Sequence, residues 1–193
     1  PLLMMAVVGT LAYEFQVSLP LLARYTLGGD AGTYGTMTAL MGAGAVVGGL
    51  LTAAARRRSP VALANMALLF GALQGAAALV PNRAMAFAAM VPLGASSIAF
   101  LSLGNATLQL TAAPEMRGRV MALWSVAFMG STPIGGPLIG WIGSMSPRWG
   151  LGVGGLATLL CGLAAYRPLA RASQTPAATA PSSPMPAEPE TPA

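Results

Sequence analysis

Long apolar runs follow one another along almost the whole of this 193-residue chain. Each has about the length, roughly 20 helical residues, that is needed to cross about 30 Å of hydrocarbon. An open chain in lipid can satisfy its backbone polar groups only as a helix. We therefore expect an all-α membrane protein with six transmembrane helices at Leu2 to Leu22, Thr33 to Ala55, Pro60 to Val80, Met85 to Ala112, Val120 to Met145 and Leu151 to Tyr166.

The balance of residue types points to lipid as the main partner. Hydrophobic residues make up 55% of the chain and charged residues only 8%, whereas soluble domains carry about 25% charged residues. The ten basic residues are all arginine and outnumber five acids, giving a net charge of +5. Nucleic-acid binding needs a basic face, but these arginines stand singly or in short clusters between apolar runs. We therefore expect no nucleic-acid partner.

Residues that could support an enzymatic reaction are missing. The chain has no histidine and one cysteine, Cys161, which lies inside an apolar run. No phosphate-binding loop, metal-ligand cluster or nucleophile triad can be assembled from the sequence. We expect neither an enzyme nor a cofactor or metal site, and any energy source would be an ion gradient.

The distribution of arginines predicts the orientation, because short cytoplasmic loops retain positive charge during insertion. One set of predicted loops and ends carries Arg56, Arg57, Arg58, Arg117, Arg119, Arg167 and Arg171. The opposite set carries only Arg24, Arg83 and Arg148. Both ends of the helical segment are therefore expected in the cytoplasm of a cell whose inner or plasma membrane holds the protein.

The two ends of the sequence suggest its organisation. Residues 1–167 form the predicted helix bundle, and residues 168–193 are rich in proline, alanine, serine and threonine. Such a composition buries too little apolar surface to offset the entropy of ordering, so we expect a disordered cytoplasmic tail. The sequence begins at Pro1 without a methionine, and we expect it to be part of a longer protein.

Glycines spaced four residues apart predict close helix packing. Such small-xxx-small pairs let two helix backbones approach each other. The pairs are Gly44 with Gly48, Gly71 with Gly75, and Gly150 with Gly154.

Two stretches go beyond the composition of a generic membrane protein, Tyr13 to Arg58 and Gly104 to Gly143. Their most specific parts are an N-x-x-x-Q helix end at 105–109, a P-E-x-R-G-R-V loop at 114–120 and a P-x-G-x-x-x-x-G helix at 133–140. They resemble the seventh-to-eighth and tenth-to-eleventh helix regions of the major facilitator superfamily. The resemblance is to the drug and siderophore exporter branch, which includes enterobactin-exporter-like proteins.

This resemblance implies a transporter of twelve helices in two halves, each an inverted 3+3 repeat beside a central path. The chain would be the C-terminal six-helix half, and the missing N-terminal half would be its partner. The expected activity is proton-coupled export of small amphipathic compounds or siderophores by alternating access. Arginine counting independently gives the first three and the last three spans opposite orientations.

Glu14 is the only acid in any predicted span and lies about 18 Å along a helix that starts at Leu2. Thr10, Glu14 and Ser18 have i, i+4, i+8 spacing and would form one polar stripe that faces a cavity. An acid in this position is often functional, so one hypothesis is proton exchange during export. The alternative is a hydrogen-bonded structural glutamate.

Other polar residues form two further predicted stripes, Ser102 with Asn105 and Gln109, and Ser125 with Thr132. These side chains could line the substrate path or bond neighbouring helices. In the fifth span, Pro133, Gly136 and Pro137 should bend the helix where backbone bonds are lost. The bend would be either a moving gate or a static kink.

Two cytoplasmic loops complete the predicted site: Arg56, Arg57 and Arg58 in one, and Pro114, Glu115, Arg117, Gly118 and Arg119 in the other. The resemblance implies that such loops latch the two halves on the inner side, although the first loop lacks the usual acid. Topology alone also accounts for these arginines. A non-transporting six-helix scaffold or partner-binding subunit remains the alternative function, and it would need no embedded acid.

Overall fold

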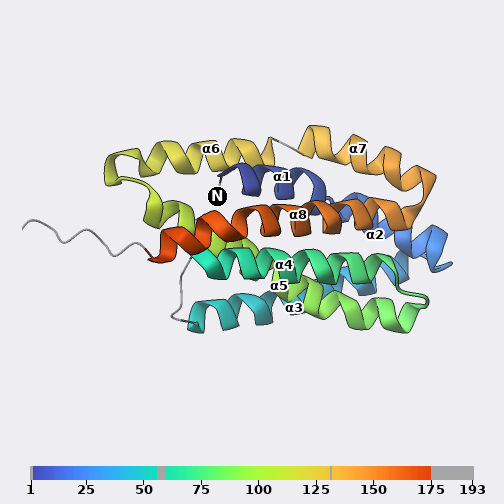
Figure 1. Cartoon of the computed structure of the whole chain (residues 1–193). Coiled ribbons are helices and arrows are strands. Elements are labelled where there is room, and N and C mark those ends of the chain that lie inside the picture. The colour runs from blue at the N-terminus through green and yellow to red at the C-terminus, as the bar shows by residue number, and fades with distance from the viewer. Residues whose placement is uncertain (1, 56–59, 131, 175–193) are drawn as a thin grey trace, which may run out of the picture.

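The computed structural model describes residues 2–55, 60–130 and 132–174, and within them the secondary structure is entirely helical. The helices run back and forth along one common axis (Figure 1). They are α1 (Leu2–Ala12), α2 (Phe15–Leu21), the π-helical turn η1 (Leu22–Thr26), α3 (Ala31–Ala54), α4 (Pro60–Ala78), α5 (Arg83–Thr111), the 3₁₀ turn η2 (Pro114–Met116), α6 (Arg117–Met129), α7 (Thr132–Met145) and α8 (Pro147–Gln174).

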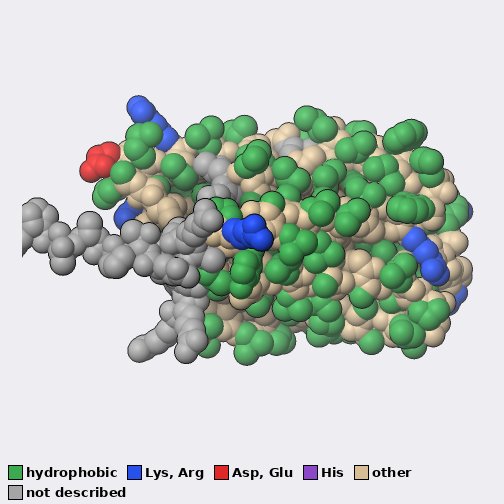
Figure 2. All heavy atoms as spheres, viewed as in Figure 1, with side chains coloured by type: hydrophobic (Ala, Val, Ile, Leu, Met, Phe, Trp, Pro, Cys, Tyr) green, Lys and Arg blue, Asp and Glu red, His purple; other side chains and the backbone are tan. Residues whose placement is uncertain are grey.

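Five helical segments of the described residues are long and apolar enough to cross a membrane: Leu3–Thr26, Ala31–Ala54, Val61–Ala78, Arg83–Thr111 and Pro147–Pro168. Many large apolar side chains on them are exposed, including Leu50, Leu51 and Leu163. Figure 2 shows this apolar surface over the length of the visible face, with arginines towards the two ends. A soluble monomer does not expose so much apolar surface, so the chain is a multi-pass, all-α membrane protein.

Helices α3, α4 and α5 match three predicted spans closely, whereas α8 is longer than predicted. It begins at Pro147 and continues to Gln174, so residues 168–174 of the predicted tail are helical. Residues 175–193, the rest of that tail, lie outside the described residues.

The first and fifth predicted spans are not continuous helices, which corrects the prediction. The first is interrupted at Tyr13 and Glu14, and the fifth is divided between α6 and α7, which lie end to end (Figure 1). The second break follows α6, which ends at Met129, four residues before Pro133. In a continuous helix the ring of Pro133 would clash with the carbonyl of Met129. Pro133 itself lies in the first turn of α7, where its missing N–H removes no helical bond.

Backbone contacts at glycines join α3 to α5 and α4 to α8. A Cβ on Gly44 would overlap the carbonyl of Val91, and one on Gly94 would overlap the carbonyl of Met41. On the other pair, a Cβ on Gly71 would lie 2.8 Å from the Gly155 carbonyl oxygen. Helices in lipid associate through such close packing, and the predicted Gly44 and Gly48 pair is confirmed as a packing surface.

At one end of the bundle, arginine side chains donate hydrogen bonds to the backbone carbonyls of the turns. The Nε of Arg83 donates to the Leu27 carbonyl at 2.9 Å and its guanidinium also donates to the Gly28 carbonyl. Arg148 donates to the Val80 carbonyl at 3.3 Å. At the same end Asp30 caps α3 by accepting from the Thr33 N–H at 3.0 Å, and this bond is the main cause that lowers the pKa of the Asp30 carboxyl.

Candidate functional site

Glu14 lies at the break in the first span, between α1 and α2. It is the N-cap residue of α2 with φ −79° and ψ 45°, and its side chain is only 7% exposed. Its backbone carbonyl accepts from the N–H groups of Val17 at 3.2 Å and Ser18 at 3.0 Å. The one acid of the predicted spans is therefore held in a buried, non-helical position.

The carboxylate of Glu14 faces two glycines of α7. A Cβ on Gly135 would lie 2.9 Å from Glu14 Oε1, and a Cβ on Gly136 would lie 3.7 Å from Oε2. A Cβ on Gly135 would also overlap the backbone carbonyl of Thr10. Because Gly135 and Gly136 have no side chains, the Glu14 carboxylate can occupy the space next to α7. Gly136, one of the residues predicted to bend the helix, therefore lies beside Glu14.

Thr10 and Ser18 do not share one helical stripe with Glu14, because the helix ends between them. The Thr10 hydroxyl donates to the Ala6 carbonyl of its own helix at 2.7 Å. Ser18 is 3% exposed and lies in the first turn of α2. The predicted i, i+4, i+8 geometry is therefore wrong, although all three residues lie within the same interrupted span.

Two side chains outside the predicted site make hydrogen bonds at the break. Gln74 of α4 donates from Nε2 to the Ala12 carbonyl at 3.0 Å, and Tyr13 donates from its hydroxyl to the Ser97 carbonyl of α5 at 2.5 Å. The sequence signal for Gln74 is a lone amide within the apolar run of α4. For Tyr13, only its position beside Glu14 distinguishes it.

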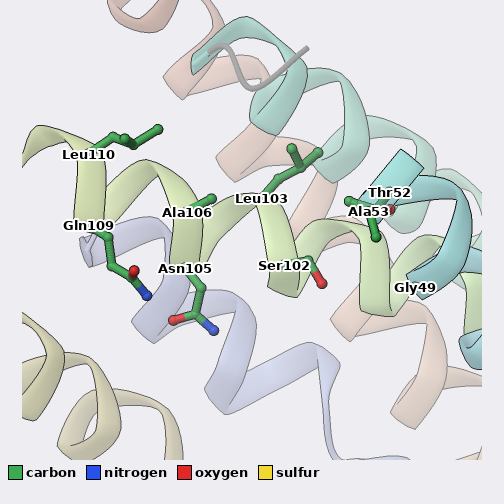
Figure 3. A pocket seen from close by; sticks show the side chains of 9 residues that line it. All are labelled: Gly49, Thr52, Ala53, Ser102, Leu103, Asn105, Ala106, Gln109 and Leu110. Atoms are coloured by element: carbon green, nitrogen blue, oxygen red, sulfur yellow. The ribbon is translucent and has the colours of Figure 1, made fainter. Parts of the chain in front are cut away.

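The second predicted stripe lines a pocket of about 320 Å³ between α3 and α5. Ser102, Asn105 and Gln109 point to the same side of α5 (Figure 3). Helix α3 contributes residues near its end, and the complete lining is Gly49, Thr52, Ala53, Ser102, Leu103, Asn105, Ala106, Gln109 and Leu110. The structure thus brings the three predicted residues of α5 together and adds Thr52.

Asn105 carries an unpaired polar atom in this pocket. Its Oδ1 is buried and has no hydrogen-bond partner among the described residues. Buried polar atoms in folded proteins nearly always have partners. The amide oxygen of Asn105, a residue that lines the pocket, is therefore an acceptor for which the described residues supply no donor.

An apolar groove of about 550 Å³ lies next to the polar pocket, between α3, α4 and α5. Its walls include Leu51, Met66 and Leu69, and it shares Thr52 and Leu103 with the polar pocket. The glycine contact between α3 and α5 is therefore followed along the helices, near Thr52 and Leu103, by two adjoining cavities of different polarity.

The third predicted stripe is not formed as expected. Ser125 is exposed on α6, and Thr132 begins α7 on the far side of the break, with its side chain outside the described residues. Pro137 lies inside α7 and Pro133 lies at its start. The interruption of the fifth span thus precedes both prolines.

The predicted loop motif is only partly described. Residues Arg56, Arg57 and Arg58 lie outside the described residues. The second loop is exposed: Pro114 and Glu115 form η2, and Arg117, Gly118 and Arg119 form the first turn of α6. Arg119 contacts the sulfur of Met116 at 3.9 Å. Within the described ranges, no group of three or more potential metal ligands is present.

Comparison with known proteins agrees with this architecture. The major facilitator family model described as "Transmembrane secretion effector" matches residues 2–191. No curated protein and no solved structure gave a significant match. Because the family model covers nearly the whole chain and the fold is a multi-pass helical bundle, the chain belongs to the transmembrane secretion effector family of major facilitator transporters, which is a family of transport proteins rather than of enzymes.

Proposed function

We propose that the chain is the C-terminal six-helix half of a secondary active transporter in the cell membrane. The complete protein would export small amphipathic compounds or siderophores by proton antiport and alternating access, with both ends of this helical segment in the cytoplasm. The missing N-terminal half would supply the other wall of the path, as in transporters built from paired repeats. The alternative function is a non-transporting scaffold.

The packing of the helices supports an inverted repeat of three plus three crossings. The interrupted segments α1–α2–η1 and α6–α7 would each count as one crossing. In such a repeat the first crossing corresponds to the fourth, the second to the fifth and the third to the sixth. The contact of α3 with α5 then corresponds to that of α6–α7 with α1–α2, and both contacts are present. Likewise, the contact of α4 with α5 corresponds to that of α8 with α1, and both are present. The contact of α4 with α8 is converted into itself, as a two-fold repeat requires.

The buried position of Glu14 is the observation that carries the proposal of proton coupling. Ionisable groups within a membrane are costly and usually mark ion pathways. Glu14 lies at a helix break, where the backbone can change conformation, and its carboxylate faces the small residues Gly135 and Gly136. Protonation would remove the charge and so change the relative stability of two arrangements of α2 and α7.

The two adjoining cavities support an amphipathic substrate. The pocket at Asn105 offers amide and hydroxyl groups, whereas the groove at Leu51 and Leu69 is apolar and lies between α3, α4 and α5. Thr52 and Leu103 belong to both. A compound with a polar group and an apolar part could therefore occupy the pocket and the groove together.

Growth of cells that express the full-length gene tests the function as a whole. We expect them to survive a panel of amphipathic toxic compounds better than control cells, and an uncoupler should abolish this advantage because it collapses the proton gradient. An advantage that persists with the uncoupler would contradict proton coupling. No advantage for any compound, from a protein present in the membrane, would favour the scaffold.

Replacing Asn105 with leucine should weaken substrate binding. The change removes the unpaired amide but keeps a similar volume, and a lost hydrogen bond of about 0.5–1.5 kcal/mol corresponds to a roughly two- to tenfold weaker affinity. Binding of an exported compound to the purified complete protein would measure this. Thr38→Val is the matched control, because the Thr38 hydroxyl is exposed and donates to the Tyr34 carbonyl of its own helix, away from the pocket lining. Equal affinities for the two variants would remove Asn105 from the binding site.

A further inference from the structure

The break between α1 and α2 has no local cause in the sequence. Sharp interruptions of helices usually occur at proline, at glycine or where a foreign side chain enters the hydrogen-bond ladder. Residues 11–15 contain neither proline nor glycine. Pro20 lies further along α2, where its ring affects the carbonyl of Gln16 and not that of Ala12.

Gln74 enters the ladder at the point of the break. In a continuous helix the Ala12 carbonyl would accept from the N–H of Gln16, four residues later. In the structure it accepts from Nε2 of Gln74, whose side chain is 1% exposed. Gln16 lies in the first turn of α2, where N–H groups have no partner within the helix.

Helix α8 is shaped to admit this side chain. A Cβ on Gly154 would lie 2.6 Å from Gln74 Nε2 and 2.6 Å from the Leu11 carbonyl oxygen. The amide oxygen of Gln74, Oε1, is buried and has no hydrogen-bond partner among the described residues. Among the described residues, the hydrogen bond to the Ala12 carbonyl is therefore the one that orients the Gln74 amide.

We propose that Gln74 is a positioning residue that holds the first span broken and thereby directs Glu14 towards Gly135 and Gly136. The Ala12 carbonyl has two competing donors, Gln74 in the broken form and the Gln16 N–H in a continuous form. In the continuous form Glu14 would turn onto one stripe with Thr10 and Ser18. The exchange of donors would thus move the carboxylate during transport, a step that rests on the proposed function.

Hydrogen exchange of the complete protein in lipid nanodiscs tests the switch directly. Gln74→Met keeps the volume of the side chain and removes its N–H donors. We expect the amide of Gln16 to exchange at least about tenfold more slowly in this variant, because it now bonds Ala12, and tenfold corresponds to about 1.4 kcal/mol. Unchanged exchange at Gln16 would overturn the proposal.

Thr158→Val is the matched control for exchange. Thr158 is as buried as Gln74, but its hydroxyl donates at 2.8 Å to the Gly154 carbonyl of its own helix. We expect exchange at Gln16 to stay at the wild-type rate. If Gln74→Met cannot be recovered folded, Gln74→Asn replaces it with the same expected slowing, since the shorter side chain does not reach Ala12.

A second variant separates Gln74 from Tyr13. Tyr13→Phe removes the hydroxyl that bonds Ser97 but leaves Gln74 in place, so the break and the fast exchange of Gln16 should persist. Slowed exchange in Tyr13→Phe together with unchanged exchange in Gln74→Met would assign the break to Tyr13 and overturn the proposal.

Transport measurements distinguish positioning from a general loss of structure. We expect Gln74→Met to bind the exported compound within about twofold of wild type while its turnover falls at least about fivefold, the low end of typical coupling energies. Parallel losses of binding and turnover would indicate damage to the fold and contradict a positioning role. Slowed exchange at Gln16 with full turnover would keep the switch in the structure but reject its part in transport.

Discussion

Proton-driven export should fall by about 5- to 150-fold when Glu14 is replaced with glutamine, the range that a coupling free energy of about 1–3 kcal/mol represents. Glutamine keeps the shape of the side chain but cannot take up and release a proton. Glu14 is buried beside Gly135 and Gly136, so the fold should tolerate the neutral glutamine, which leaves no charge to be buried. Export from inverted vesicles or whole cells with an imposed pH gradient measures the effect.

Asp30→Asn provides the matched control for the loss of a carboxylate. Asp30 lies outside the predicted spans at the start of α3, where its carboxylate caps the helix and lies near Arg83. Asparagine is an equally good cap residue, so export should stay close to the wild-type rate. If Glu14→Gln exports as fast as Asp30→Asn and both are stopped by an uncoupler, Glu14 has a structural role and another group carries the proton.

The extents of most helices could be predicted from the sequence because they depend on local composition. Apolar length alone placed α3, α4 and α5 within a few residues of their ends. The two breaks could not be predicted in the same way. The first is held by Gln74, which lies 62 residues from Ala12 in the sequence, and the second lies before Pro133 and not at the proline itself.

The candidate site shows the same division between local and distant information. Ser102, Asn105 and Gln109 lie on one uninterrupted helix, so their spacing was enough to place them on one face. The predicted stripe of Thr10, Glu14 and Ser18 assumed a continuous helix and was wrong for that reason. The contribution of Thr52 to the pocket depends on how α3 packs against α5, which no spacing within either helix reveals.

Gly44→Leu should prevent or strongly weaken the packing of α3 against α5. The new Cβ would overlap the backbone carbonyl of Val91, which cannot rotate away as a side chain could. Overpacking of this kind costs about 1–3 kcal/mol when the structure can adjust, and more where two backbones must separate. Thermal unfolding of the purified complete protein in detergent would measure the loss.

Gly42→Leu and Gly35→Leu lie on the same helix and serve as controls, because a Cβ at either position meets nothing within 4 Å. Their stability should stay within about 0.5 kcal/mol of wild type, as for most surface substitutions. Thr52 of α3 and Ser102 of α5 line the same pocket, and they can do so only if the two helices stay in contact. Gly44→Leu should therefore also weaken substrate binding more than either control does. Equal stability and binding in all three variants would mean that α3 and α5 do not meet at Gly44, and the pocket at Asn105 would then lose its second wall.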